Sequence, residues 1–345
     1  MTVPDSAAST TLAGLTTLRL GGPAAELVEA HDEATLVEAV RSADSEGTPV
    51  LLVGGGSNLV VADEGYAGRV VVVRKMGLRV ESDLCGGAYV EVGAGHNWDD
   101  VVAEAVANGW VGVEALSGIP GTTGATPIQN VGAYGQEISQ TLARVRTWDR
   151  KLAGFRTFAA ADCDFGYRTS RFKRDPGRFV VLSTTFQFSL GDLGAPVQYA
   201  ELARALGIET GHRAPAYEVR EAVLALRRRK AMVLDPADHD TWSTGSFFTN
   251  PVVPADVVPD GAPTWPQPDG LVKTSAAWLI EQAGFTKGYG SDRVRLSSRH
   301  TLAITNRGGG TTAELLDLAR ELQAGVEQRF GITLVNEPVL VGCRL

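Results

Sequence analysis

Several short stretches of the sequence combine residue types that could bind or transform a small anionic ligand. The first is a run of three glycines at residues 54–56, which Ser57 and Asn58 follow. Glycine permits a positive φ and a close approach of the backbone to a ligand, and successive NH groups can donate to phosphate oxygens. The run has neither the glycine spacing of a dinucleotide-binding fingerprint nor the Gly-Lys-Ser/Thr of a P-loop. It therefore indicates either a diphosphate-binding loop or an ordinary glycine turn.

A second glycine-rich stretch, residues 117–135, is longer and more specific. It mixes glycine with small hydroxyl residues and contains the amide pair Gln129 and Asn130. Ile119 and Val131 are among the apolar residues interleaved in it, which argues against a flexible linker. We predict an ordered, partly buried loop along which an extended cofactor lies.

Three further stretches each present one group suited to chemistry on a carboxylic acid. Arg168 lies among aromatic residues, where its guanidinium could grip a carboxylate in two places. Ser246 lies between Gly245 and two phenylalanines, which would shield its hydroxyl from water and position it to donate a proton. Glu337 is a lone carboxylate in an apolar stretch, where burial would suit it to proton handling. Each residue also has a purely structural alternative. Arg168 could lie on a surface strand with a packed aromatic residue, Ser246 could be a turn hydroxyl, and Glu337 could be a charge on an edge strand.

Metal and serine-hydrolase chemistry are not indicated. The five histidines show no HExxH or other paired-ligand spacing, and no serine lies in a GxSxG pattern. The three cysteines are odd in number and far apart, which argues against a disulfide framework and a cysteine-rich zinc site, and we expect buried small hydrophobes in a reduced compartment. These residues are His31, His96, His212, His239 and His300, and Cys85, Cys163 and Cys343.

The composition is that of a folded protein without a basic charge bias. Hydrophobic residues make up 44% of the 345 residues, and 32 Lys and Arg face 40 Asp and Glu, so no overall field is present to hold a nucleic acid. The densest apolar run, residues 70–73, is far shorter than the roughly 20 residues of a membrane span. Residues 1–11 lack the basic start and apolar core of a signal peptide. We therefore expect a soluble, cytoplasmic protein of two or three domains.

Helices and strands alternate around the first glycine run and must position it. A helix capped by Asp32 precedes an apolar strand at residues 49–53, which leads directly into the glycines. Residues 70–73 and 89–92 have the composition of strands, and residues 98–108 have that of an amphipathic helix.

Beyond residue 135 the pattern becomes richer in strands. Residues 144–148, 155–158 and 179–188 indicate an antiparallel layer, and residues 190–215 indicate a loop. The remaining predicted elements are a basic helix over residues 217–230, a proline-rich loop over 251–268, a helix around 276–282, a strand over 301–305, a long helix over 311–329 and a closing strand over 333–341.

Taken in order, these stretches resemble the UDP-N-acetylenolpyruvoylglucosamine reductase family over nearly the whole chain. The resemblance implies an α+β fold of the vanillyl-alcohol-oxidase (PCMH) type with two FAD-binding subdomains, residues 1–75 and 76–228, and a smaller α/β substrate-binding domain, residues 229–345. The second subdomain would carry an inserted loop with Tyr199, and the last strand would return to the active site. The matching motifs are Leu20-Gly21-Gly22, Gly54 to Asn58, Gly93-Ala94-Gly95 with Trp98, Ile119 to Gly135, Tyr167-Arg168 with Phe172-Lys173, Gly245 to Pro251, Ala277 to Ile280, and Glu337.

The resemblance also implies a reaction and its participants. NADPH would reduce a non-covalently bound FAD, and hydride would pass from flavin N5 to UDP-N-acetylglucosamine enolpyruvate, giving the peptidoglycan precursor UDP-N-acetylmuramate. Ser246 would protonate the carbon that bears the carboxylate, and Arg168 and Glu337 would hold that carboxylate as an enediolate-like species. A monomer that acts on a UDP-sugar, without nucleic-acid or membrane partners, is implied.

Binding roles follow from the resemblance position by position. FAD would contact Gly54, Gly55, Gly56, Ser57, Asn58, Gly118, Ile119, Pro120, Gly121, Gly124, Asn130 and Gly132. The substrate would contact Tyr167, Tyr199, Lys230, Asn250, Trp265 and His300, and the neighbours Arg227, Arg228 and Arg229 leave open which cation meets the diphosphate. The chain departs from the family pattern at Val335-Asn336-Glu337, where Glu-Pro-Glu is usual, and at Trp265 and His300, where Tyr and Gln are known.

Two other functions stay open on the sequence. One is a sugar or alcohol oxidase of the same FAD-binding superfamily, although many of those tether FAD to a histidine where this chain has Ser57 and Asn58. The other is a non-catalytic nucleotide-binding or scaffold protein, which would hold no flavin. The visible spectrum of the purified protein separates this second alternative from both enzymes.

Overall fold

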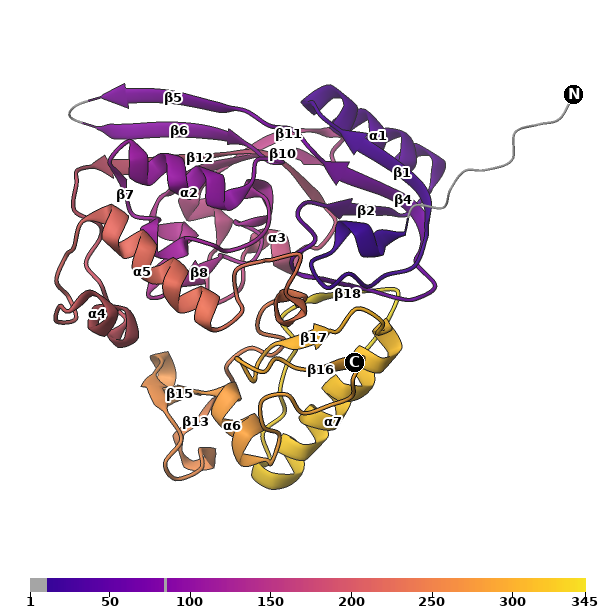
Figure 1. Ribbon diagram of the computed structural model, residues 1–345. Coiled ribbons are helices and arrows are strands. Elements are labelled where there is room, and N and C mark those ends of the chain that lie inside the picture. Colours follow the sequence, from indigo (N-terminus) through magenta and orange to yellow (C-terminus); the bar gives the residue numbers. More distant parts are fainter. Residues whose placement is uncertain (1–10, 84–85) are drawn as a thin grey trace, which may run out of the picture. The chain divides into compact units, whose positions relative to one another are not determined.

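The computed structural model describes residues 11–83 and 86–345, and Cys85 lies outside them. Figure 1 shows that each of its two compact units combines segments distant in the sequence. The predicted division into three domains stays a prediction. The larger unit consists of Glu26–Gly55 and Gly68–Arg229, and the smaller unit consists of the described part of Met1–Ala25, Gly56–Ala67 and Lys230–Leu345.

A three-stranded sheet leads into the first glycine run. Its edge strand β2 (Val50–Val53) pairs in parallel with β4 (Tyr66–Val73), whose other neighbour is β1 (Ala24–Ala30). The connection from β1 to β2 contains α1 (Glu33–Glu46). The predicted strand before the glycines and the predicted helix before that strand are both confirmed.

Helices with clear terminal signals form where the sequence predicts them. The side chain of Asp32 accepts the third NH of α1 at 2.7 Å, and Gly47 ends this helix at a φ of 70°. The long helix α7 (Thr312–Phe330) begins with a capping box between Thr311 and Glu314. Its apolar face is buried in the core of the smaller unit.

The predicted antiparallel layer is confirmed and forms the main sheet of the larger unit. The strand order is β11-β10-β12-β6-β5, and the short β7 also pairs with β12. The strands are β5 (Leu78–Asp83), β6 (Gly87–Gly93), β7 (Trp110–Val111), β10 (Leu142–Asp149), β11 (Gly154–Ala159) and β12 (Phe179–Leu190).

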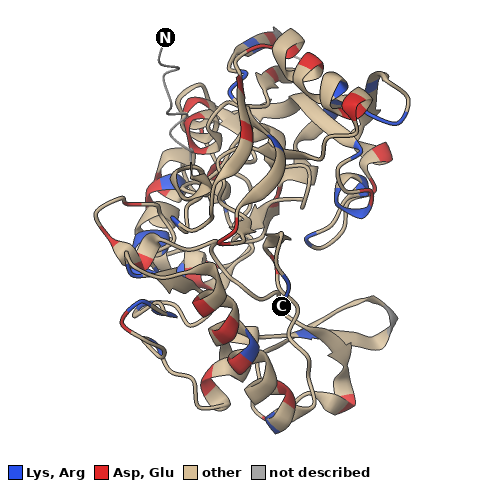
Figure 2. Ribbon diagram, turned by 90° about the vertical axis from the view of Figure 1, so that its right-hand side faces the viewer, with Lys and Arg blue, Asp and Glu red and all other residues tan. Residues whose placement is uncertain are grey.

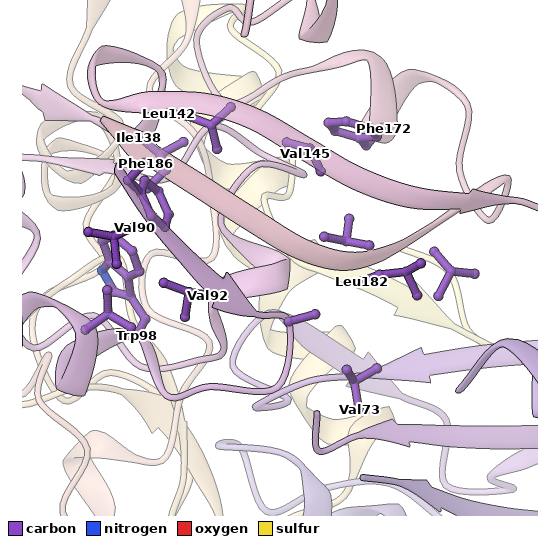
Figure 3. Close-up of a cluster of buried hydrophobic side chains, with 14 of the residues drawn as sticks. Val73, Val90, Val92, Trp98, Ile138, Leu142, Val145, Phe172, Leu182 and Phe186 are labelled. Carbon is purple, nitrogen blue, oxygen red and sulfur yellow. The ribbon is translucent and has the colours of Figure 1, made fainter. Parts of the chain in front are cut away.

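The core of the larger unit lies against this sheet and is shown in Figure 3. Trp98, at the start of α2 (Trp98–Ala107), is fully buried, and its ring centroid lies 5.8 Å from that of Phe186. Its indole NH donates to Leu116 O at 3.2 Å, so the ring is buried without an unpaired donor. Burial of one such aromatic side chain contributes about 1.5–3 kcal/mol. The helix is thereby fixed beside the segment that precedes the second glycine-rich stretch.

The loop predicted over residues 190–215 is wrong in part, because it contains α4 (Ala200–Leu206). Leu202 of α4 packs with Val219 of α5 (Ala216–Arg229) in a separate buried cluster. A helix of seven residues has too few turns to show a periodic apolar pattern. The predicted basic helix that follows is confirmed as α5.

The proline-rich loop predicted over residues 251–268 is also wrong in part. It contains β13 (Val252–Pro254) and β14 (Thr264–Pro266), which both pair antiparallel with β15 (Leu271–Thr274). Each of the two is an edge strand that ends at its proline. Edge strands tolerate proline, so the composition concealed a small sheet.

The last two predicted strands are present but shorter. β17 (Ile304–Asn306) begins only after a turn in which Ala303 N donates to His300 O. β18 (Val339–Val341) pairs in parallel with β3 (Leu59–Val61). The remaining helices and strands are α3 (Arg171–Arg174), α6 (Ala276–Gln282), β8 (Gly132–Ala133), β9 (Gln136–Glu137) and β16 (Val294–Leu296).

Acidic and basic residues are interspersed along the helices and loops, as Figure 2 shows. Within the described part of the chain, no helix is both long and apolar enough to cross a membrane. Cys163 is buried as predicted, and burial raises the pKa of its thiol to about 12. Cys343 is only half-buried, so the prediction of full burial is wrong there.

Candidate functional site

Gly54 and Gly55 of the first glycine run lie against the second glycine-rich stretch within the larger unit. A Cβ atom on Gly54 would stand 2.3 Å from Thr122 Oγ1, and one on Gly55 would stand 2.6 Å from Gly121 Cα. Gly55 therefore requires glycine because the backbone of Gly121 is in the way, whereas a Cβ atom at residue 54 would require the Thr122 hydroxyl to move. Two loops that the sequence predicted separately are neighbours in space.

The peptide NH groups of Gly54, Gly55, Gly56 and Ser57 form a row of donors. Among the residues that the structure describes, none of these four NH groups donates to a protein acceptor. Consecutive NH groups in a glycine turn form a concavity suited to an anion such as a phosphate. The donor set thus fits the diphosphate-binding alternative better than an ordinary turn.

The second stretch is ordered by backbone hydrogen bonds, as predicted. Trp98 N donates to Gly121 O at 3.0 Å, and Gly124 N donates to Ala94 O at 2.9 Å. A Cβ atom on Gly124 would stand 2.5 Å from the Cβ of Ala94, so the loop is packed closely on the segment after β6. A flexible linker would show none of these contacts.

Asn130 performs a structural task in this loop. Its amide nitrogen donates to Glu137 Oε2 at 2.7 Å and to Gly166 O at 3.2 Å, and its amide oxygen accepts the NH of Ser139 at 3.1 Å. The side chain is buried and committed to the protein. The predicted FAD contact of Asn130 stays a prediction and would involve its backbone.

Arg168 is held against the same loop. Its guanidinium donates to Gly132 O at 2.7 Å and lies 5.3 Å from the ring centre of Tyr167. Arg168 itself has a φ of 53°, and its carbonyl accepts a hydrogen bond from Lys173 Nζ at 3.0 Å. The sequence placed these residues in two separate stretches, and the fold joins them.

Asp99 anchors the beginning of the loop and was missed from the sequence. It accepts Gly118 N at 2.6 Å and two hydrogen bonds from Arg220 of α5, at 2.6 and 3.0 Å. Burial acts to raise the pKa of Asp99, but the hydrogen bonds from Arg220 and Gly118 outweigh it and lower the pKa below its ordinary value of 3.8. Asp99 therefore ties α2, α5 and the glycine loop together as a carboxylate.

The Asp99→Asn variant is expected to be less stable than the wild type at pH 7 by about 1–3 kcal/mol, because it loses charge-assisted hydrogen bonds. The folded state lowers the pKa of Asp99. The stabilisation by its carboxylate is therefore complete at a pH above the pKa of the unfolded state, and it is lost as the pH falls through the pKa of the folded state. The difference between the two proteins should thus shrink below about pH 4. Urea unfolding of both proteins at pH 7 and pH 3 measures this difference in the free energy of unfolding.

Asp100→Asn is the matched control for this experiment. Asp100 is exposed and lies in the same first helical turn, so it shares the interaction with the helix dipole but not the contacts to Arg220 and Gly118. Equal losses of stability in the two variants would contradict the anchoring role of Asp99.

Glu114 is a second buried carboxylate that sequence reasoning missed. It is fully buried and accepts Gly112 N at 2.7 Å, Gln136 Nε2 at 2.9 Å and Ala195 N at 2.5 Å. It thereby connects the segment before the glycine loop with the segment that leads to Tyr199. A lone Glu among apolar residues was the only signal.

Tyr199 lies at the amino end of α4 and contacts the second glycine-rich stretch. Its ring meets that of Tyr134 edge to face, with the centroids 5.6 Å apart. Burial raises the pKa of Tyr134 to about 12 and also raises the pKa of Tyr199. Arg227 is half-buried near Tyr134, and burial lowers its pKa. Arg227 thus interacts electrostatically with Tyr134, another residue of the larger unit.

Ser246 and Glu337 are brought together within the smaller unit. Glu337 N donates to Phe247 O at 2.8 Å, and Phe248 and Asn336 form an antiparallel bridge. Ser246 thus directly precedes the residue that pairs with Glu337. Both phenylalanines are fully buried, which confirms that the serine adjoins a hydrophobic core.

The segment before Ser246 is fixed by a buried ionic cluster at Asp240. This carboxylate accepts hydrogen bonds from Ser298 Oγ, from Arg299 Nε at 3.3 Å and from Arg307 Nη1 at 2.7 Å. Burial acts to raise the pKa of Asp240, but Ser298 and the two arginines lower it. Asp240 is only 4% exposed, so its charge is balanced by these partners and not by water.

The other predicted substrate residues of the smaller unit are spread over several of its elements. Asn250 Oδ1 accepts the NH of Ala276 at 3.0 Å and so caps α6. Trp265 of β14 is 41% exposed and lies opposite Lys273 of β15. Lys230 begins the last of the three segments that form this unit, and His300 lies in the turn before β17. Arg168, Tyr167 and Tyr199 are residues of the larger unit.

Comparisons with known proteins agree with one another over the chain. Residues 24–151 match the model of an FAD binding domain, and residues 235–341 match that of the C-terminal domain of UDP-N-acetylenolpyruvoylglucosamine reductase. A protein of that name from Cutibacterium acnes is 56% identical, with 97% of this chain and 90% of the relative covered. One from Streptomyces avermitilis is 54% identical, with 97% and 94% covered. The crystal structure of the Thermus caldophilus reductase has a TM-score of 0.64 at 25% identity, with 96% of this chain and 97% of that chain covered.

Proposed function

The chain belongs to the UDP-N-acetylenolpyruvoylglucosamine reductase family, and on this premise we propose which of its residues carry out the reaction. It has the α+β FAD-binding fold of the vanillyl-alcohol-oxidase type. It is a flavin-dependent oxidoreductase that uses FAD and NADPH to convert UDP-N-acetylglucosamine enolpyruvate to UDP-N-acetylmuramate in peptidoglycan precursor synthesis.

Residues 54–57 would bind the diphosphate of FAD through their row of NH groups. Gly118, Ile119, Pro120, Gly121, Gly124 and Gly132 of the neighbouring loop would line the cofactor, together with Asn58 and the backbone of Asn130. When bound, FAD accepts hydride from NADPH and delivers it to the methylene carbon of the enol ether. The close contact between the two loops supports a shared role, because a substitution in one would displace the other.

Arg168 and Glu337 would stabilise the negative charge that hydride addition creates on the substrate. This charge develops on the carbon that bears the carboxylate and spreads onto the carboxylate oxygens. The NH groups of Arg168 would bind those oxygens, and a protonated Glu337 would share a proton with them. The fixed contact of Arg168 to Gly132 O supports this role, because a guanidinium that is already oriented needs little reorganisation.

Ser246 would donate the proton that completes the reaction. Its hydroxyl proton passes to the carbon that bears the carboxylate, a new C–H bond forms, and the serine oxygen is then reprotonated from solvent. A serine hydroxyl is a weak acid, but the acceptor is a strongly basic carbon once water is excluded. The single observation that supports this assignment is the pairing of Phe247 with Glu337, which places Ser246 next in the chain to the partner of Glu337 and beside two buried phenylalanines.

Six residues would bind the substrate, and the proposal also includes the oligomeric state and the cellular location of the enzyme. Tyr199 would close over the uridine diphosphate from its position against Tyr134. A monomeric, cytoplasmic enzyme without a nucleic-acid partner is the expected state. The substrate contacts are Tyr167, Tyr199, Lys230, Asn250, Trp265 and His300, and Arg227, Arg228, Arg229 and Lys230 stay candidates for the diphosphate.

Purified protein is expected to be yellow, to release its flavin on acid precipitation, and to oxidise NADPH only when the enolpyruvyl sugar nucleotide is present. Absorbance at the NADPH band, with and without this substrate and under anaerobic conditions, measures the reaction. Oxygen-dependent consumption of an alcohol or a sugar would instead support an oxidase, and a colourless protein would contradict both enzymes.

A further inference from the structure

The segment that leads to Ser246 contains two buried polar atoms without a protein partner. Thr244 is 9% exposed, and its Oγ1 makes no hydrogen bond with any described residue. The indole nitrogen of Trp242 is likewise buried and unpaired within the described chain. Buried polar groups are almost always hydrogen-bonded, so two unpaired donors in one short segment require an explanation.

The two hydroxyl groups that precede Thr244 in this segment are engaged. Thr241 Oγ1 donates to Asp235 O at 2.8 Å and to Asp238 O at 2.7 Å. Ser243 Oγ accepts the NH of Gly245 at 3.1 Å. Thr244 therefore differs from the two hydroxyl residues beside it, Thr241 and Ser243.

The backbone on both sides of Thr244 is held in place. Thr17 Oγ1 donates to Ser243 O at 2.7 Å, and Asn306 N donates to Trp242 O at 3.1 Å. On the other side, Phe247 N donates to Leu302 O at 2.7 Å. With the backbone fixed at both ends, Thr244 cannot gain a partner by a small shift of its own segment.

We propose that Thr244 is a further catalytic residue of this enzyme, whose hydroxyl donates a hydrogen bond to the carboxylate of the enolpyruvyl group. The inference rests on the proposed role of Ser246 as the proton donor. Two residues span at most about 7 Å of chain. The carbon that Ser246 protonates is bonded directly to the carboxylate, so on this proposal the carboxylate would bind beside the segment that carries Thr244.

The chemistry of the reaction favours a carboxylate as the acceptor. The carboxylate oxygens gain negative charge when hydride adds to the neighbouring carbon, and a hydrogen bond to them strengthens as this happens. Thr244 would therefore contribute to binding and to turnover. A carbonyl oxygen of the flavin offers a similar acceptor, and the test separates the two sources.

The variant Thr244→Val removes the hydroxyl and keeps the shape of the side chain. Because this hydroxyl has no protein partner, the melting temperature of the substrate-free protein should be unchanged or higher. The value of kcat/KM for the sugar nucleotide should fall about 10- to 100-fold, which is the range for a hydrogen bond to a charged group. The Thr244→Ser variant, which retains a hydroxyl, should recover most of this loss, and flavin reduction by NADPH should be unaffected.

Thr241→Val is the matched control, because that hydroxyl has two protein acceptors. It should lower the melting temperature and leave kcat/KM of the folded protein within about threefold. A lowered melting temperature of Thr244→Val, or a kcat/KM within twofold of the wild type, would overturn the inference. Slower flavin reduction in Thr244→Val would place the contact on the cofactor and also overturn it. Wild-type protein without substrate-dependent NADPH oxidation would instead contradict the proposed function itself.

Discussion

Replacement of Ser246 by alanine is expected to lower turnover of the enolpyruvyl sugar nucleotide by about 10³-fold, the middle of the range for loss of a general acid. Hydride addition leaves a basic carbon that needs a proton from a fixed donor, and Ser246 would be that donor. Its backbone is held by the pairing of Phe247 with Glu337 and Leu302. Reduction of the flavin by NADPH does not need this proton and should proceed at the wild-type rate.

Stopped-flow absorbance separates the two half-reactions of Ser246→Ala. The flavin should bleach normally with NADPH and then regain its colour slowly when the sugar nucleotide is added without oxygen. Ser243→Ala is the control, because Ser243 lies in the same loop and accepts the NH of Gly245 without a proposed chemical role. Turnover of Ser246→Ala within tenfold of the wild type would rule out Ser246 as the proton donor.

The fold could be predicted from the sequence where local signals and tertiary packing agree. α1 and α7 have capping residues at their starts and apolar faces of several turns, and both formed as expected. α4 has only seven residues, which is too short for a periodic apolar pattern in the sequence. Its Leu202 packs on α5, a tertiary contact that the sequence does not reveal. β13 and β14 were concealed because proline argues against strands unless the strand is known to lie at an edge.

The sequence indicates candidate chemical groups for the site but not the contacts that support them. Arg168, Ser246 and Glu337 stand out because their side chains are unusual for their surroundings in the sequence. Asp99, Glu114 and other buried carboxylates are ordinary acidic residues in the sequence. Their importance depends on which distant NH groups the fold brings to them, such as Gly118 N for Asp99 and Ala195 N for Glu114.

Asn130 illustrates the opposite case, in which a residue suggested a ligand contact but serves the protein. An amide side chain in a glycine-rich loop is chemically suited to a cofactor. In the fold, the amide of Asn130 instead makes hydrogen bonds with Glu137, Gly166 and Ser139. A single sequence cannot separate these outcomes, because the three partners are defined by tertiary structure alone.

Replacement of Arg168 by alanine is expected to reduce kcat by about 10²- to 10³-fold, which is the typical effect of removing one donor to a developing oxyanion. The side chain is oriented before substrate binds by its hydrogen bond to Gly132 O and by the ring of Tyr167. Arg168→Lys keeps the charge but replaces the planar fork of donors by a single ammonium group. It should therefore recover only part of the lost activity.

Added guanidinium ion should restore part of the activity of Arg168→Ala and should not affect Arg174→Ala, the matched control. Arg174 lies in the same segment, but it is exposed and binds Asp164. Rescue by guanidinium requires a binding position for the free ion next to the reacting carboxylate, so a purely structural role of Arg168 would not produce it. If Arg168→Lys and Arg168→Ala were equally active, and neither responded to guanidinium, the fork of donors would not act on the substrate. Arg168 would then act through its contacts within the protein, such as the hydrogen bond to Gly132, and the loss of activity would have to appear as a loss of stability in both variants.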